Sequence, residues 1–96
     1  MWLDAERERL RHLRLHVLES WAQALAEWGR FGLALDVALV ALRSDVLRES
    51  AHRTVIKVHR LEGNVLEARR AFDTCRRILS EEMGVAPTPE TAALVP

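Results

Sequence analysis

The sequence predicts an all-α fold of two antiparallel helical hairpins followed by a short C-terminal capping helix. Long stretches consist of Ala, Leu, Arg and Glu, residues that favour the helical conformation. The chain contains only 4 Gly and 3 Pro, and every Pro follows residue 86. Glycines stand at the ends of long stretches with helical apolar periodicity, which is where helices stop.

The first expected helix covers about residues 4–28, with Asp4 as its N-cap. Apolar residues recur along it at three- and four-residue steps, which predicts one face buried against the rest of the protein. These residues are Leu10, Leu13, Val17, Leu18, Trp21, Leu25 and Trp28. We therefore expect Trp21 and Trp28 in the core.

Four more helices are expected, at about residues 31–44, 46–62, 65–83 and 89–94. Gly63 and Gly84 are expected to end two of them, because glycine readily adopts the left-handed conformation that follows many helices. Thr88 and Pro89 are expected to open the last helix, since proline is favoured at a first helical position.

Two glycine turns repeat each other at an offset of 34 residues, Gly29 matching Gly63. The aligned pairs are Phe31 with Val65, Ala34 with Ala68, Ala38 with Phe72, and Ala41 with Cys75. In each copy the hydrophobic residue after the glycine is expected to plug the turn, and the following alanine to let two helices approach closely. The spacing resembles the tetratricopeptide (TPR) repeat, a helix–turn–helix unit that stacks into a right-handed array.

Three further stretches narrow the resemblance to one bacterial family. They are W-L-D-A-E-R-E-R-L from Trp2, D-V-L-R-E-S-A-H-R from Asp45, and L-S-E-E-M-G-V-A-P-T-P-E from Leu79. In this order they resemble the bacterial transcriptional activator domain, which follows the DNA-binding domain of antibiotic-regulatory (SARP-type) activators. Val46 stands where the family has proline, and Phe72 where it often has tyrosine.

This resemblance covers nearly the whole chain and implies a TPR-like protein–protein interaction module that regulates transcription initiation. The family's winged-helix DNA reader is missing here, so we expect an excised domain or a very short protein. The implied partner is the transcription machinery or the regulator's own DNA-binding domain. A generic TPR adaptor that holds an acidic peptide tail, unrelated to transcription, is the alternative function.

Composition argues against several other functions. The 14 basic and 14 acidic residues cancel, which disfavours nucleic-acid binding through bulk charge. The sequence has neither a secretion signal nor the run of about 18 apolar residues that a membrane-spanning helix needs, so a cytoplasmic location is expected. No nucleophile motif or phosphate-binding glycine loop occurs, so we expect neither enzymatic activity nor a cofactor.

In the TPR frame, the first helix of each hairpin lines an inner, concave surface. The expected lining residues are His16, Glu19, Gln23, Glu27, Ser50, Arg53, Lys57 and Arg60. Arg53, Lys57 and Arg60 share one helix face, a basic stripe suited to an acidic peptide or a carboxylate terminus. In the alternative interpretation, Glu19 and Glu27 neutralise this stripe from the neighbouring helix.

The helix expected at residues 31–44 is apolar nearly all round, interrupted only by Asp36. We expect it to be sandwiched between neighbouring helices. If Leu33 and Val40 on its outer side are exposed, they mark a surface where the DNA-binding domain or a second subunit docks. A homodimer is one outcome of such docking.

The remaining reactive side chains predict no chemistry. His12 and His16 lie four residues apart, but two ligands without a third do not predict a metal site. His52 and His59 are expected to have packing roles. Cys75 aligns with a small core position and is expected to be a buried, unreactive thiol.

Overall fold

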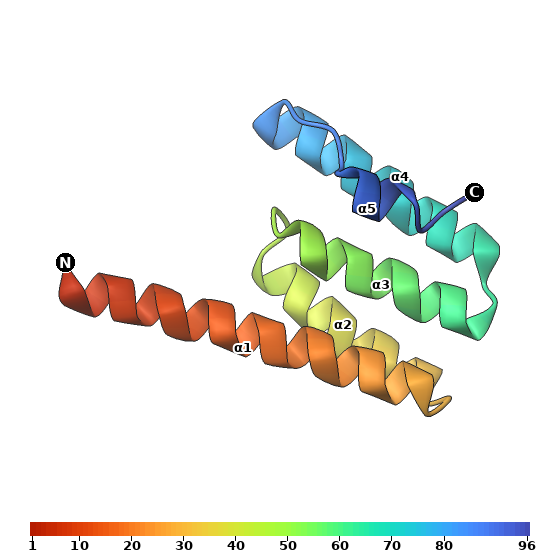
Figure 1. The fold of residues 1–96 in the computed structure, drawn as a ribbon, viewed down its shortest axis with the longest axis horizontal. Helices are drawn as coiled ribbons and strands as arrows, with labels where there is room; N and C mark the ends of the chain where they lie inside the picture. The colour runs from red at the N-terminus through yellow and green to blue at the C-terminus, as the bar shows by residue number, and fades with distance from the viewer.

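The computed structural model describes residues 1–96 and contains five α-helices and no strand. The helices are α1 (Trp2–Glu27), α2 (Phe31–Ser44), α3 (Glu49–Glu62), α4 (Val65–Met83) and α5 (Pro89–Ala92). Helices α1 and α2 form one antiparallel hairpin and α3 and α4 the second, and α3 contacts both α1 and α2 (Figure 1). The predicted all-α, TPR-like array is therefore confirmed.

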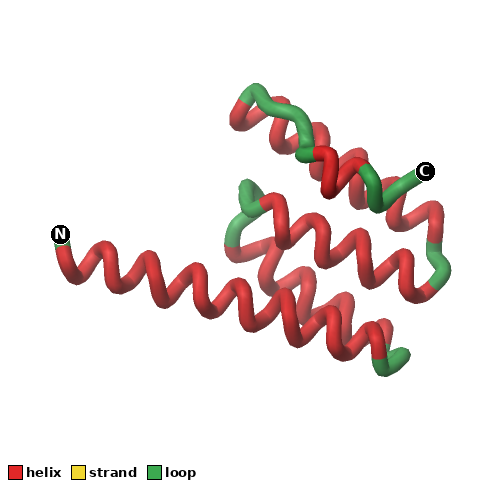
Figure 2. The backbone as a smooth tube through the Cα atoms, in the orientation of Figure 1, coloured by secondary structure: helices red, strands yellow, loops and turns green.

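Tight turns join the helices within each hairpin, as the short loops in Figure 2 show. Gly63 follows α3 with a φ of 83°, a left-handed conformation that costs a residue with a side chain about 1–2 kcal/mol. The backbone N–H of Asn64 then donates to the carbonyl of His59, and the Asn64 side chain accepts a hydrogen bond from the N–H of Glu67. One short segment thus ends α3 and caps α4.

Helix α3 begins at Glu49, three residues later than expected. The Asp45 carboxylate accepts a hydrogen bond from the Leu47 N–H at 3.1 Å. His52, which is buried, donates from Nε2 to the carbonyl of Val46 at 2.7 Å. These two bonds hold residues 45–48 in a turn, because they offer the backbone an alternative to helical pairing.

The other helix ends also differ slightly from the predicted ones. Helix α1 begins at Trp2, so Asp4 lies in its first turn and is not the N-cap. The helix ends at Glu27, and α5 ends at Ala92, short of the predicted residue 94. Thr88 is the residue before α5, as expected, but its side chain makes no capping bond to the helix.

Small residues occupy most of the aligned core positions of the two hairpins. Ala34 is fully buried and Ala68 is 2% exposed, so the aligned alanines pack as the repeat predicts. The other aligned residues of the helix interiors, Ala38, Ala41, Phe72 and Cys75, are buried as well. The expected turn plug is half-buried at Phe31 but exposed at Val65, where the prediction is wrong.

The C-terminal segment covers the second hairpin. Leu94 and Val95 pack against a cluster formed by Ile56 on α3 and by Ala68 and Phe72 on α4. Thr91 of α5 is completely buried. The expected capping role of the last helix is therefore confirmed.

The face of α1 that enters the core is only partly the predicted one: Leu25 is buried and Leu18 packs against the core, as expected, but the rest of the predicted face is exposed. The buried residues are Leu15, Glu19, Ala22, Leu25 and Ala26. Trp21 and Trp28 are 51% and 77% exposed, so their assignment to the core is wrong. Helix α1 carries two apolar stripes, and periodicity alone does not select the one that faces the bundle. The stripe containing alanines packs inward because small side chains permit close helix contact.

Candidate functional site

The second apolar stripe of α1 remains in solvent. We call it the α1 stripe and define it as Leu3, Leu10, Val17, Trp21 and Trp28. The first three lie at seven-residue steps, Trp21 continues the same side of the helix, and Trp28 follows directly after the helix ends at Glu27. Each of the five side chains is at least half exposed. The stripe therefore runs the full length of a helix that is about 39 Å long.

Such a long apolar surface needs an explanation. Folded monomers rarely expose apolar patches larger than a few hundred Å², and aromatic residues are enriched in the cores of protein interfaces. All 3 tryptophans of the chain are exposed, including Trp2 near the N-terminus. The N-terminal half of α1 also projects beyond the second hairpin (Figure 1). Chemistry and shape together suit docking against another folded protein.

The apolar outer side of α2 is smaller. Leu33 and Val40 are 42% and 43% exposed, at positions seven residues apart. Most other apolar residues of α2 are buried or half-buried between α1 and α3, which matches the expected sandwich. Two half-exposed aliphatic side chains form a much weaker candidate surface than the α1 stripe.

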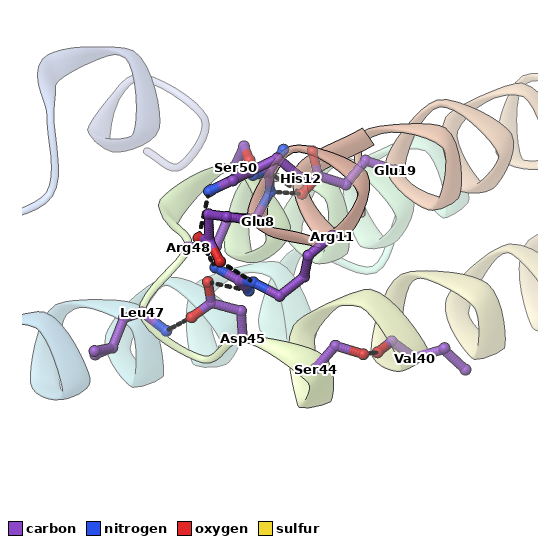
Figure 3. A network of polar contacts seen from close by, with 10 residues as sticks. All are labelled: Glu8, Arg11, His12, Glu19, Val40, Ser44, Asp45, Leu47, Arg48 and Ser50. Atoms are coloured by element: carbon purple, nitrogen blue, oxygen red, sulfur yellow. Dashed lines mark hydrogen bonds and ion pairs between the residues drawn. The ribbon is translucent and has the colours of Figure 1, made fainter. Parts of the chain in front are cut away.

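A polar network fastens α1 to the turn before α3 (Figure 3). Arg11 on α1 reaches the Asp45 carboxylate at 3.1 Å and also pairs with Glu8 at 2.9 Å. Hydrogen bonds from Arg11 lower the pKa of Glu8 from its ordinary value. Arg48 joins the same network through the Nδ1 atom of His12, at 3.0 Å. The network links α1 to the connection between the two hairpins.

The expected inner surface is present as a groove between α1 and α3. A cavity of about 350 Å³ is lined by His16, Glu19, Ser20, Gln23, Arg48, Ser50, Arg53, Thr54, Lys57 and Glu90. A second cavity of about 330 Å³ shares Gln23 and Lys57 with it and adds Glu27, Arg60, Leu61 and Leu94. The structure thus brings together all eight predicted lining residues.

Ion pairing within the groove differs from the alternative in which Glu19 and Glu27 neutralise the basic stripe of α3. Glu19 is buried and binds Arg48 at 2.8 Å and the Ser50 hydroxyl at 3.0 Å, so it does not pair with the basic stripe. Glu27 forms no ion pair and accepts only a long hydrogen bond from Gln23. The stripe is therefore not neutralised from α1.

Arg53 is instead satisfied by acidic residues of α3 and of the C-terminal segment. It lies 3.5 Å from the Glu49 carboxylate and 3.8 Å from that of Glu90, and it donates to the Thr91 hydroxyl at 3.2 Å. Lys57 and Arg60, one and two turns further along α3, form no ion pair. Lys57 and Arg60, at the end of the basic stripe, are thus the two cations available to a ligand.

Glu49 ties the C-terminal segment to α3. Its carboxylate accepts hydrogen bonds from the Thr88 N–H at 2.9 Å, from the Thr88 hydroxyl at 2.7 Å and from the Thr91 hydroxyl. Burial alone would raise the pKa of Glu49, but the bonds from Thr91 and Thr88 and the charge of Arg53 outweigh it and lower the pKa from its ordinary value. The ionised form therefore holds the segment in place.

We expect Glu49→Gln to lower the free energy of unfolding at pH 7 by about 1–2 kcal/mol, since charge-assisted hydrogen bonds are replaced by neutral ones. A carboxylate with a lowered pKa stabilises the fold above its unfolded-state value of 4.5, and the stabilisation is lost as the pH falls through the lower folded-state pKa. Denaturant melts across the acid range should therefore show a shallower pH dependence in the variant than in the wild type. Glu82→Gln, at an exposed position, is the control; identical acid limbs for wild type and Glu49→Gln would contradict the assignment.

The histidines and the cysteine do not gather into a site for metal binding or catalysis. His12 pairs with Glu8 at 2.9 Å, and no group of three or more His, Cys, Asp or Glu side chains is placed to hold a metal ion. Cys75 is buried, as predicted, and burial raises the pKa of its thiol to about 11. None of the helices has the length and apolar content that crossing a bilayer requires.

Sequence reasoning missed two features of these surfaces. Helical periodicity predicts a buried position for every residue of the α1 stripe except Leu3, although the second, alanine-containing stripe beside them is a visible signal. The Glu49 cluster joins residues about 40 positions apart, and no local pattern predicts that contact.

The structure is a helical-repeat domain with an exposed apolar helix face and a partly cationic groove. The family model described as the bacterial transcriptional activator domain matches residues 1–95. The chain therefore belongs to the bacterial transcriptional activator domain family, as the sequence resemblance predicted. It is 30% identical over 93 residues to "Regulatory protein AfsR" of Streptomyces griseus. The match covers 97% of this chain but only 10% of that protein, and no solved structure matches the chain significantly.

Proposed function

We propose that this domain is a protein–protein interaction and regulatory module of a bacterial transcriptional activator, and that the α1 stripe docks against the activator's DNA-reading domain. The observation that carries the proposal is the stripe itself: five apolar side chains, two of them tryptophan, exposed along a single helix face. Family membership associates the chain with transcriptional activators and favours this role over an adaptor unrelated to transcription.

Charge supports assigning DNA recognition to a different domain. The chain has a formal net charge of zero. All four arginines of α4 are already paired with carboxylates: Arg69 and Arg76 with Asp73, Arg70 with Glu67, and Arg77 with Glu81. Paired arginines attract phosphates weakly, so the chain alone is not expected to bind promoter DNA. With a role in transcription, we expect the domain to act in the cytoplasm.

In this proposal the α1 stripe contacts a different domain, the DNA-reading domain, and not a second copy of this chain. The projecting end of α1 carries Arg7 and Arg14 beside the stripe, and neither forms an ion pair. A second copy in parallel register would bring these like charges together, which is unfavourable. An antiparallel homodimer remains the competing arrangement, and sedimentation of the isolated chain tests it directly.

A reporter assay tests the proposal. In an activator that carries this domain behind its DNA-reading domain, Leu10→Glu with Val17→Glu is expected to reduce transcription to the level without activator, because burying two carboxylates in an apolar interface is strongly unfavourable. Both side chains are about half exposed, so the domain itself should keep its helical content and stability.

The double variant Val65→Glu with Leu66→Glu on α4 is the matched control, since it places the same two charges on exposed apolar residues outside the stripe. It should leave activation intact. Full activation by the stripe variant, or an equal loss in the control, would contradict docking through the α1 stripe.

A further inference from the structure

The groove between α1 and α3 contains two cationic side chains that the fold leaves unpaired. Arg48 and Arg53, which also line the groove, each lie within 4 Å of a carboxylate oxygen. Lys57 and Arg60 have no such partner, although they follow Arg53 on the same face of α3. Lys57 is half-buried, so its charge is partly shielded from water and available to a groove ligand.

Apolar and polar groups surround these two cations. The cavity beside them holds Leu61 of α3 and Leu94 of the C-terminal segment, with Gln23 and Glu27 on the opposite wall, formed by α1. Its volume of about 330 Å³ is within the range of small-ligand sites, roughly 300–1,000 Å³. Through Gln23 and Lys57 it continues into the neighbouring cavity, so an extended ligand can run along the groove.

Arg53, the first cation of the basic stripe on α3, indicates which ligand chemistry this face of α3 recognises. Arg53 is already bound by the carboxylates of Glu49 and Glu90, and Glu90 comes from the segment that folds back onto α3. Carboxylates of the chain itself therefore occupy one end of the stripe. Lys57 and Arg60 offer equivalent positions to a carboxylate from outside.

We propose that Lys57 and Arg60 bind a carboxylate of an extended peptide whose adjacent apolar side chain contacts Leu61 and Leu94. Glu27 and Gln23 are placed to accept the peptide's backbone N–H groups. The acidic Glu27 and Glu90 also line the groove, which disfavours the continuous phosphate chain of a nucleic acid and favours a peptide with both donors and a negative charge. This site is independent of the α1 stripe, which occupies a different side of α1.

Titration of the complete domain with a short peptide tests the site. The probe is Gly-Glu-Glu-Leu with a free C-terminal carboxylate, and its C-terminal amide is the second arm. We expect saturable NMR shift changes at Lys57, Arg60 and the α1 residues facing them. Lys57→Gln and Arg60→Gln should each weaken binding about tenfold, because each removes a charge-assisted hydrogen bond.

The two peptide arms identify which carboxylate is bound. Weaker binding of the amide assigns the C-terminal carboxylate, and equal binding assigns a glutamate side chain; either result supports the site. Arg43→Gln is the matched control, because Arg43 is an exposed arginine without an ion pair at the end of α2. Failure of both peptides to shift groove residues, or equal weakening by Arg43→Gln, would overturn the proposal.

Discussion

Leu15→Ala is expected to lower the free energy of unfolding by about 2–5 kcal/mol, the range for truncating a buried leucine. Leu15 is completely buried on the inward face of α1. The substitution removes apolar contacts and leaves a cavity between rigid helices, which relax only partly to fill it. Urea or thermal unfolding measured by circular dichroism at 222 nm, the usual helix signal, gives the change directly.

Leu13→Ala is the matched control, because Leu13 lies two residues away on the same helix and is 50% exposed. The same chemical change there should cost less than about 1 kcal/mol, since a surface position creates no cavity. Similar losses at the two positions would mean that α1 packs through a different face from the one described.

Trp21→Ala with Trp28→Ala is expected to weaken binding to the DNA-reading domain by about 1,000-fold, because tryptophans in an interface often contribute about 2 kcal/mol each and every 1.4 kcal/mol is about tenfold in affinity. The isolated chain should unfold almost as the wild type does, since Trp21 and Trp28 are 51% and 77% exposed. Calorimetric titration of the chain with the separately produced DNA-reading domain of a family activator measures the affinity.

Val65→Ala with Leu66→Ala provides the comparison for this double variant. Both residues are about 60% exposed, but they lie at the start of α4, outside the α1 stripe. Their removal should leave the affinity unchanged. If it weakens binding as much as the tryptophan substitutions do, the docking surface lies elsewhere.

The hairpin architecture follows from local patterns that the chain repeats. Each glycine turn is followed at a fixed distance by an alanine, and Ala34 and Ala68 occupy equivalent buried positions. Such patterns are predictable because turn conformation and close helix approach depend on residues near one another in sequence. The groove residues followed from the same frame, since helical spacing places Arg53, Lys57 and Arg60 on one face.

Local patterns do not predict which helix faces and which side chains contact one another in the folded protein. The inward face of α1 depends on which stripe fits α2 and α3, and the larger tryptophan stripe was wrongly placed in the core. Lys57 and Arg60 lack an ion pair with Glu19 because Glu19 pairs with Arg48, a contact between residues 29 positions apart. Tertiary packing settles both questions, and local spacing by itself decides neither.

Tryptophan quenching tests the central claim most directly, because all 3 tryptophans are exposed and two belong to the α1 stripe. In the isolated chain, a soluble quencher should reach them freely at every protein concentration; adding the DNA-reading domain should shift the emission to shorter wavelength and protect them. Unchanged quenching in the complex would contradict docking through this helix face. Protection that grows with the concentration of the isolated chain would instead show that a second copy covers it.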